Sequence, residues 1–237
     1  MSLILYVGNH NYSSWSMRAG VLLRAFVPNF TETLLHFDGF GPGSAFKKTA
    51  GALSPTATVP ILVDTDARDT FGDPLTIWDT LAIAEYIAEY TDDAVWPKDR
   101  VMRAQMRSLC AEMHAGFHAL RSNCPMNIGP DLSQTGKIIW RDHADVRANV
   151  DRLVAAWSAA LSRSNGPFLG GNFGAVDAYF APVVMRLDTY GLPVPPEMRA
   201  FMDRVIAFPA VADWIKTAIE TAVFIDFEEP YRSSPDM

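Results

Sequence analysis

The chain has 237 residues, of which 49% are hydrophobic and 20% charged, so it has the composition of a globular protein of one or two domains. Its formal net charge is −7 at pH 7, and no basic run with interspersed aromatic residues occurs, so we expect no nucleic-acid partner. The two cysteines, Cys110 and Cys124, match neither metal-ligand spacing nor a C-x-x-C motif, which favours free thiols and no metal site. Without a membrane-length apolar segment or a secretory leader pattern, we expect no membrane association and a cytoplasmic location.

Strand and helix patterns alternate in the first ninety residues. The apolar run Leu3–Val7 predicts a strand, and the apolar stretch after Ser14 predicts a helix that ends near Phe26. Partial alternation over 30–37 suits a second strand, which makes a βαβ start plausible. Further along, the pattern predicts a short helix over 45–50, a strand from residue 61, a hairpin loop over 64–74, a strand over 75–78 and a helix from residue 79.

The segment 91–99 is the predicted domain boundary, because it is polar, contains a proline and marks the end of the strand patterns. We therefore expect one domain over 1–90, a linker over 91–99 and an all-helical domain over 100–237. The expected helices cover 100–121, 135–162, 175–187, 196–208 and 209–223, and Ile138, Ile139, Val146, Val150, Leu153, Val154, Trp157 and Leu161 are candidates for the core.

Two adjacent hydroxyls, Ser13 and Ser14, lie where the first helix is expected to begin. Unpaired backbone N–H groups and aligned peptide dipoles at such a position favour bound anions. Either serine could equally act only as a helix N-cap. Asp79 and Thr80 form a second helix start of the same kind, and Asp79 could again be a simple cap.

The sequence Val59-Pro60 stands at the entrance of the third predicted strand. A trans proline at the first residue of a strand is the usual arrangement. A cis bond would instead leave the N–H and C=O of Val59 pointing outward, free to pair with an extended ligand.

Several of these motifs, in this order along the chain, resemble the cytosolic glutathione transferases. The stretch Ser13-Ser14-Trp15-Ser16-Met17-Arg18 is similar to the serine-type signature of the tau and zeta classes, in which a serine precedes an arginine by five residues. The segments 58–62, 79–87 and 168–178 resemble the cis-proline segment, the acidic–hydroxyl helix start and the capping region of the helical domain. The resemblance implies an α/β thioredoxin-like N-terminal domain (βαβ–ββα) followed by an all-α C-terminal domain.

The chain also departs from the family pattern. Ser14 replaces the proline of tau enzymes, and Trp15 replaces the cysteine of zeta enzymes. Thr58 stands where a lysine or glutamine is common, so one contact to glutathione could be missing. Gly174 stands where a capping serine or threonine is usual; glycine costs little as an N-cap, so we expect the helix to form and Asp177 to serve folding.

The resemblance implies that a serine hydroxyl holds the glutathione sulfur as a thiolate. A hydrogen bond to a charged group contributes about 1.5–3 kcal/mol, enough to lower a thiol pKa by about 1–2 units from about 8.5. Ser13 is the first choice from its spacing to Arg18, with Ser14 as a second donor or substitute. Arg18 itself could support the site or form an ion pair on the helix surface. The residues expected to bind glutathione are Thr58, Val59, Pro60, Asp79 and Thr80.

The electrophile is expected to lie against the first long helix of the second domain. Core or surface roles remain the simpler interpretation of His114 and Phe117, whereas the cation of Arg121 could hold an acidic substrate. The candidate pocket residues are His114, Phe117, Arg121 and Met126, with Asn127 nearby.

Three functions fit these residues. The first is glutathione conjugation to small electrophiles, the second is glutathione-dependent isomerisation of a maleyl-type substrate, and the third is non-catalytic glutathione binding. Thiol–disulfide exchange is disfavoured because serine occupies the thiol position. The resemblance also implies a homodimer, and glutathione as co-substrate without a metal.

Overall fold

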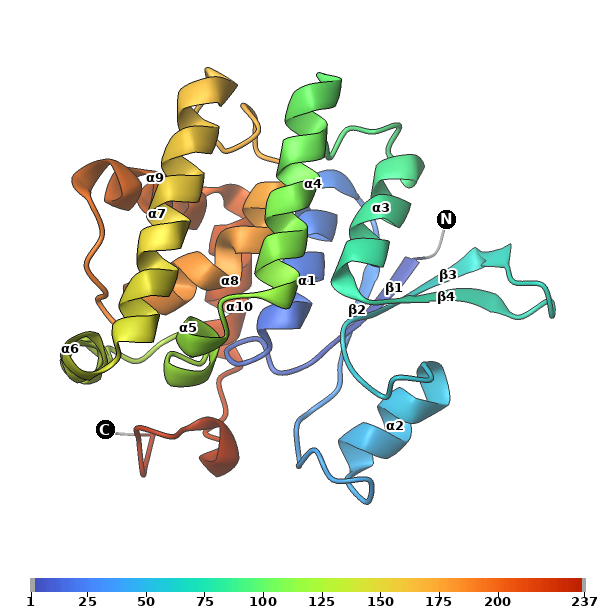
Figure 1. The fold of residues 1–237 in the computed structure, drawn as a ribbon. Helices are drawn as coiled ribbons and strands as arrows, with labels where there is room; N and C mark the ends of the chain where they lie inside the picture. Colours follow the sequence, from blue (N-terminus) through green and yellow to red (C-terminus); the bar gives the residue numbers. More distant parts are fainter. Residues whose placement is uncertain (1–2, 236–237) are drawn as a thin grey trace.

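The structure is a computed structural model that describes residues 3–235. A four-stranded mixed sheet forms the first part of the chain, with strand order β2-β1-β3-β4 (Figure 1). Strand β1 (Leu3–Val7) pairs in parallel with β2 (Thr31–Leu34) and antiparallel with β3 (Ile61–Arg68), which in turn pairs antiparallel with β4 (Pro74–Trp78). A parallel pair needs a crossover and an antiparallel pair only a hairpin, so this pattern is the predicted βαβ–ββα unit.

Helices cover both faces of the sheet. Helix α1 (Ser14–Phe26) forms the crossover between β1 and β2, and it packs with α3 (Thr80–Tyr90) on one face. Helix α2 (Ala45–Leu53) lies on the other face, where Phe46 and Ala50 form a small core with strand residues (Figure 1). Because side chains alternate along a strand, Leu62 joins the larger core while its neighbours Ile61 and Val63 join the smaller one.

The remaining chain is helical, as predicted. Helix α8 is at its centre and packs against α1, so that one continuous apolar core contains residues from both parts of the chain. Trp157 and Phe201 from the surrounding helices pack edge to face in that core. The helices are α4 (Arg100–Ala115), α5 (His118–Asn123), α6 (Ser133–Asp142), α7 (Ala144–Ser164), α8 (Ala175–Thr189), α9 (Pro196–Ala207) and α10 (Pro209–Glu220), followed by the 3-10 turn η1 (Asp226–Glu228).

Two predicted long helices are each divided in two. The helix expected over 100–121 ends at Ala115, because Phe117 has a left-handed backbone (φ 58°) that an α-helix does not accommodate. The helix expected over 135–162 is interrupted at His143, whose backbone is extended (ψ 90°). Of the two adjacent core candidates, Ile139 is buried and Ile138 is 55% exposed, because successive residues of a helix point about 100° apart and only one of them can face the core.

Two local features also bear on the predictions. Strand β3 continues to Arg68 through residues expected to begin a hairpin loop, because it keeps pairing with β4 as far as Asp64 and again at Arg68. The Val59–Pro60 bond is cis, as the resemblance to the cis-proline segment implies, and not in the usual trans arrangement. The proposed domain limits remain a prediction, although α3 ends at Tyr90 and α4 begins at Arg100.

Candidate active site at the start of helix α1

Ser13 is the N-cap of helix α1. Its hydroxyl oxygen accepts a hydrogen bond from the N–H of Ser16 at 3.3 Å, and its own proton is donated to Oγ of Ser16 at 2.8 Å. Ser16 Oγ also accepts the backbone N–H of Gly8 at 3.0 Å, which ties the cap to the end of strand β1. Ser13 therefore has the capping role considered for it, and its hydroxyl proton is already donated to Ser16.

Ser14 is the first residue of α1 and has a different set of partners. Its Oγ accepts a hydrogen bond from Nη2 of Arg186, on helix α8, at 3.1 Å. Among residues 3–235, no acceptor for the Ser14 hydroxyl proton is found. A hydroxyl that accepts from a guanidinium and retains its proton is a good donor to an anion.

Three arginines surround this hydroxyl and the neighbouring Trp15 ring. The guanidinium of Arg18 lies 4.3 Å from the centre of the Trp15 ring, and that of Arg121 lies 4.9 Å from it. No carboxylate of the described residues forms an ion pair with Arg18, Arg121 or Arg186. The Glu228 carboxylate, which acts to raise the pKa of Arg186, compensates part of this charge, and the remaining positive charge favours an anion at the start of α1.

Arg18 and Arg186 are both almost fully buried. Burial lowers the pKa of Arg18 to about 9 and that of Arg186 to about 10, so both remain cationic at neutral pH. Arg18 donates from Nε to the carbonyl of Tyr179 at 3.0 Å and from Nη1 to the carbonyl of Ser14 at 3.2 Å. The alternative of a helix-surface ion pair for Arg18 is therefore wrong.

Two neighbouring hollows lie over these residues and share Trp15, Thr58 and Val59 in their walls. The first, here called the serine cavity, has a volume of about 210 Å³ and is lined by Tyr12, Ser13, Ser14, Trp15, Phe37, Phe40, Phe46, Lys47, Thr58, Val59 and Glu228. The second, here called the aspartate cavity, has a volume of about 200 Å³ and is lined by Trp15, Thr58, Val59, Pro60, Asp79, Thr80 and His114. The structure thus brings the two serines and all five expected glutathione-binding residues to adjoining walls.

Asp79 caps helix α3 and has a strained backbone. Its φ of 76° is rare for a residue with a side chain, and such strain is concentrated at binding sites. One carboxylate oxygen accepts the N–H of Leu81 at 2.8 Å, and the other lies 3.5 Å from Nε2 of His114. The side chain is 44% exposed in the aspartate cavity, so a ligand ammonium can reach it.

A tyrosine from helix α8 connects the next residue to the helical domain. The hydroxyl of Tyr179 lies 2.9 Å from Oγ1 of Thr80 and 2.8 Å from Nδ1 of His114. The two predicted site residues are thereby held together at the wall of the aspartate cavity. Tyr179 also stacks on the guanidinium of Arg18, with 4.8 Å between ring centre and Cζ, so the same side chain positions both ends of the site.

The other candidate pocket residues are less accessible. Phe117 and Met126 are buried in the main core, at 8% and 2% exposure, and line neither cavity. Arg121 donates to the carbonyls of His114 and Gly116 and reaches the site through its contact with Trp15. Asn127 donates to Glu229 of the C-terminal segment at 2.8 Å.

The sequence interpretation missed Arg186 and Glu228. Arg186 does carry a signal, since it is a lone arginine in the otherwise apolar face of a predicted helix, and a buried arginine needs partners. Glu228 carries none, because an acidic residue in a polar segment near the end of a chain is ordinary. Its place in the wall of the serine cavity depends on how the segment after α10 folds back.

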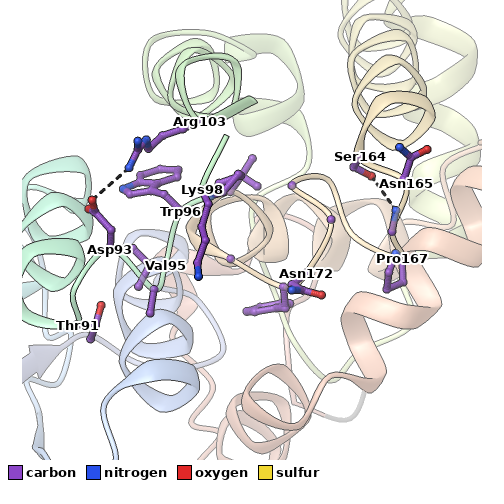
Figure 2. A pocket seen from close by; sticks show the side chains of 18 of the residues that line it. Thr91, Asp93, Val95, Trp96, Lys98, Arg103, Ser164, Asn165, Pro167 and Asn172 are labelled. Atoms are coloured by element: carbon purple, nitrogen blue, oxygen red, sulfur yellow. Dashed lines mark hydrogen bonds and ion pairs between the residues drawn. The ribbon is translucent and has the colours of Figure 1, made fainter. Parts of the chain in front are cut away.

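A larger hollow of about 830 Å³ lies elsewhere, between the 91–98 segment and the loop 164–174 (Figure 2). Arg103 and Asp93 form an ion pair of 3.1 Å at its edge, and none of the predicted site residues lines it. The loop is held by Asp177, whose carboxylate accepts the N–H groups of Leu169 and Gly174, each at 3.0 Å. Asp177 thus has the folding role predicted for it, and helix α8 forms behind Gly174.

Both cysteines are free and buried, as the sequence predicts. Burial raises the pKa of the Cys124 thiol to about 12 and raises that of Cys110 further, so neither is a thiolate at neutral pH. Within residues 3–235, no cluster of three or more histidine, cysteine or acidic side chains could hold a metal. The helices of the same residues include none long and apolar enough to cross a bilayer.

Comparison with known families identifies the fold. The family model of the glutathione S-transferase N-terminal domain matches residues 12–90, and that of the C-terminal domain matches residues 139–217. The chain belongs to the glutathione S-transferase family. Its sheet-and-helix first part and helical second part are the two domains of that family, and its N-terminal part has the thioredoxin-like fold.

Solved structures of this family have the same fold. A glutathione transferase homolog from a Burkholderia, strain BGR1, with bound glutathione is 24% identical, with a TM-score of 0.65 over 94% of this chain and 100% of that one. A glutathione S-transferase from Rhodospirillum rubrum F11 is 20% identical, with a TM-score of 0.65 over 94% and 93%. Ure2p in complex with S-hexylglutathione is 17% identical, with a TM-score of 0.64 over 90% and 97%.

Proposed function

We propose that this family member is a glutathione transferase in which a serine hydroxyl holds the glutathione sulfur as a thiolate for attack on small electrophiles. The observation that supports it most directly is the hydrogen bond from Arg186 to Ser14, which leaves the Ser14 proton for a ligand. Ser13, the first choice from the sequence, already donates its hydroxyl proton to Oγ of Ser16. Ser14 is therefore the donor to sulfur in this proposal, and Ser13 holds the helix start that carries it.

The energies are sufficient for this role. An unperturbed thiol has a pKa of about 8.5, and lowering it by one to two units requires about 1.4–2.7 kcal/mol. A hydrogen bond to a charged sulfur contributes about 1.5–3 kcal/mol, and the end of a helix adds about 0.3–1 kcal/mol. The nearby arginines Arg18, Arg121 and Arg186 act in the same direction, since each lacks a carboxylate partner among the described residues.

In this proposal the rest of glutathione binds in the aspartate cavity. The Asp79 carboxylate would bind the ammonium of the γ-glutamyl group, while the start of helix α3 and the Thr80 hydroxyl would bind its carboxylate. The backbone of Val59, in the wall shared by both cavities, would pair with the cysteinyl residue, flanked by Thr58 and Pro60. This places the ligand sulfur toward the serine cavity.

The test compares Ser14→Ala with Ser13→Ala. Glutathione affinity is measured by calorimetry, the pKa of the bound thiol by its thiolate absorbance, and turnover with a chloronitrobenzene. Ser14→Ala should raise the thiol pKa by about 1–2 units, the equivalent of the lost charged hydrogen bond, and Ser13→Ala should raise it less. An unchanged thiol pKa in the double variant would contradict the mechanism, and tight binding without turnover in the wild type would favour a non-catalytic glutathione-binding protein.

A second candidate function is isomerisation of a maleyl-type dicarboxylate. It is supported by Arg121, a cation without a carboxylate partner in the described chain that stacks on Trp15, a wall residue of both cavities. Arg121→Ala should then reduce activity on anionic substrates more than on neutral ones. Equal effects on both would contradict the role.

A homodimer, as the family resemblance implies, is part of the proposed function and is measured by sedimentation.

A further inference from the structure

The segment after helix α10 folds back over the serine cavity and is anchored by Glu229. The Tyr12 hydroxyl donates to Glu229 Oε1 at 2.6 Å, and the Asn127 amide donates to Oε2 at 2.8 Å. Arg232 pairs with the same carboxylate at 3.2 Å, and Glu229 is only 5% exposed. A buried charge with three such partners fixes the preceding turn η1 in place.

That anchor directs the neighbouring carboxylate, Glu228, to the wall of the serine cavity, where Ser13 and Ser14 also lie. Within residues 3–235, the Glu228 carboxylate has no hydrogen bond or ion pair. The charged or titratable groups facing it are Arg186 of helix α8, Lys47 of helix α2, Tyr12 of the loop before α1, and Glu229 of its own segment. The Lys47 ammonium donates a hydrogen bond to the carbonyl of Ala57, and the Tyr12 hydroxyl donates one to Glu229.

These surroundings allow the Glu228 carboxyl to take up and release a proton near neutral pH. Burial raises the pKa of Glu228 to about 6, Glu229 acts in the same direction, and Arg186 opposes both. A general acid or base works best when its pKa lies near the working pH. An ordinary surface glutamate, at about 4.3, would be a poor proton carrier there.

We infer that Glu228 takes the proton of the glutathione thiol and returns it to the electrophile when the thiolate adds to an activated double bond, such as that of an α,β-unsaturated carbonyl compound. This inference rests on the proposed function, since it needs glutathione in the serine cavity. It deepens that function by naming the residue that moves the proton.

The proton and electron pairs balance in two steps. First, the S–H bond breaks, its electron pair stays on sulfur and the proton forms an O–H bond on Glu228. Next, the thiolate adds to the β-carbon, the electrons of the C=C bond move to an enolate, and the enolate takes the proton back from Glu228. The carboxylate is regenerated and no other reactant is needed.

Glu228 should therefore matter more for addition than for substitution. When a thiolate displaces a halide from an aromatic ring, the leaving group departs as an anion and no proton has to be returned. Only addition needs a proton donor within reach of the electrophile. The side chains of Phe37, Phe40 and Phe46 give the serine cavity an apolar wall for such a compound.

The test measures kcat/KM for an α,β-unsaturated ketone and for a chloronitrobenzene with the full chain. Glu228→Gln should lower the addition rate by about 100-fold, the usual contribution of a positioned acid–base group, and lower the ratio of addition to substitution by at least about tenfold. Asp226→Asn is the matched control, because it removes a charge from the same turn outside the cavity. It should leave the ratio at the wild-type value.

A second variant gives an independent readout. Glu228→Ala should lose the addition reaction and regain part of it when formate is added, because a small carboxylate can occupy the vacated space; the wild type should not respond. Equal losses for both reactions, or an unchanged ratio, would overturn the inference while leaving the proposed function intact. A wild-type protein that binds no glutathione would overturn both.

Discussion

Arg186 donates a hydrogen bond from Nη2 to Oγ of Ser14, and the two residues are 172 positions apart in the chain. The same guanidinium donates from Nη1 to the carbonyls of Cys124 and Arg121. One side chain of helix α8 therefore sets the orientation of the first hydroxyl of helix α1. The helical part of the chain thus contacts the proposed thiol site directly.

Replacing Arg186 by lysine should weaken thiol activation. A lysine keeps the charge, but its single nitrogen cannot bond to Ser14 Oγ and both carbonyls in the fork geometry of a guanidinium. We expect the pKa of bound glutathione to rise by about one unit, equivalent to about 1.4 kcal/mol, as measured by thiolate absorbance. Arg199→Lys, at an exposed pair with Asp188 and Asp203, is the control and should not move this pKa. An unaltered pKa in Arg186→Lys would show that Ser14 needs no orientation.

Replacing Arg18 by alanine should destabilise the fold strongly. The change leaves the carbonyls of Ser14 and Tyr179 without these donors and removes the stacking on Trp15. A hydrogen bond from a charged group contributes about 1.5–3 kcal/mol, so the free energy of unfolding should fall by about 2–4 kcal/mol in urea titrations. Arg152→Ala, which removes an exposed pair with Glu112, should cost no more than about 1 kcal/mol. Similar losses in both variants would refute the structural role of Arg18.

Replacing Gly20 by alanine should also destabilise the protein, although alanine is the better helix former. A Cβ at this position would lie 2.1 Å from the Trp214 ring, which is fully buried. Overpacking of this kind costs about 1–3 kcal/mol, more than the gain of about 1 kcal/mol from helix propensity. Gly43→Ala, with nothing within 4 Å of the added carbon, is the matched variant for thermal unfolding. A Gly20→Ala protein that melts higher than wild type would disprove the close contact.

Asp177 should make the stability of the protein depend on pH. Burial raises its pKa to about 7 in the folded state, while the unfolded value stays near 3.8. The folded state therefore binds more protons between these pH values, and the free energy of unfolding attributable to Asp177 falls as pH rises from about 4 to about 7. In Asp177→Asn this slope should disappear, with an overall loss because an amide cannot accept from both Leu169 and Gly174. Urea titrations at several pH values measure both effects, and a slope that survives in the variant would assign it to another group.

The parts of the site that depend on neighbouring residues could be predicted from the sequence. A serine before an apolar helical run predicts a cap, and Ser13 forms one; Asp79 caps α3 in the same way. The order of strands and helices in the first domain follows from local periodicity and is confirmed by the sheet. The assignments of individual site residues remain predictions, although most of them line two adjoining cavities.

The parts that depend on distant residues could not be predicted. The contact between Ser14 and Arg186 joins residues that are 172 positions apart in the chain. Glu228 reaches the cavity wall through the folding back of the segment that Glu229 anchors. The helix break before Phe117 was missed although it has a local signal, since Gly116 lies inside the predicted helix and glycine is common at a helix end; Gly116 is the C-cap of α4. Periodicity in the sequence shows which face of a helix is buried, but it does not show which other helix packs against that face.

The packing of helix α1 also bears on how this protein is made. Its buried side contacts helices α8 and α10, which begin at Ala175 and Pro209, so those partners leave the ribosome long after α1 does. Until then the side of α1 that packs on these helices, where Gly20 lies against the Trp214 ring, stays uncovered. Vectorial folding of the sheet domain is thus incomplete until most of the polypeptide has been translated, and shielding by a chaperone would be of most benefit in that interval.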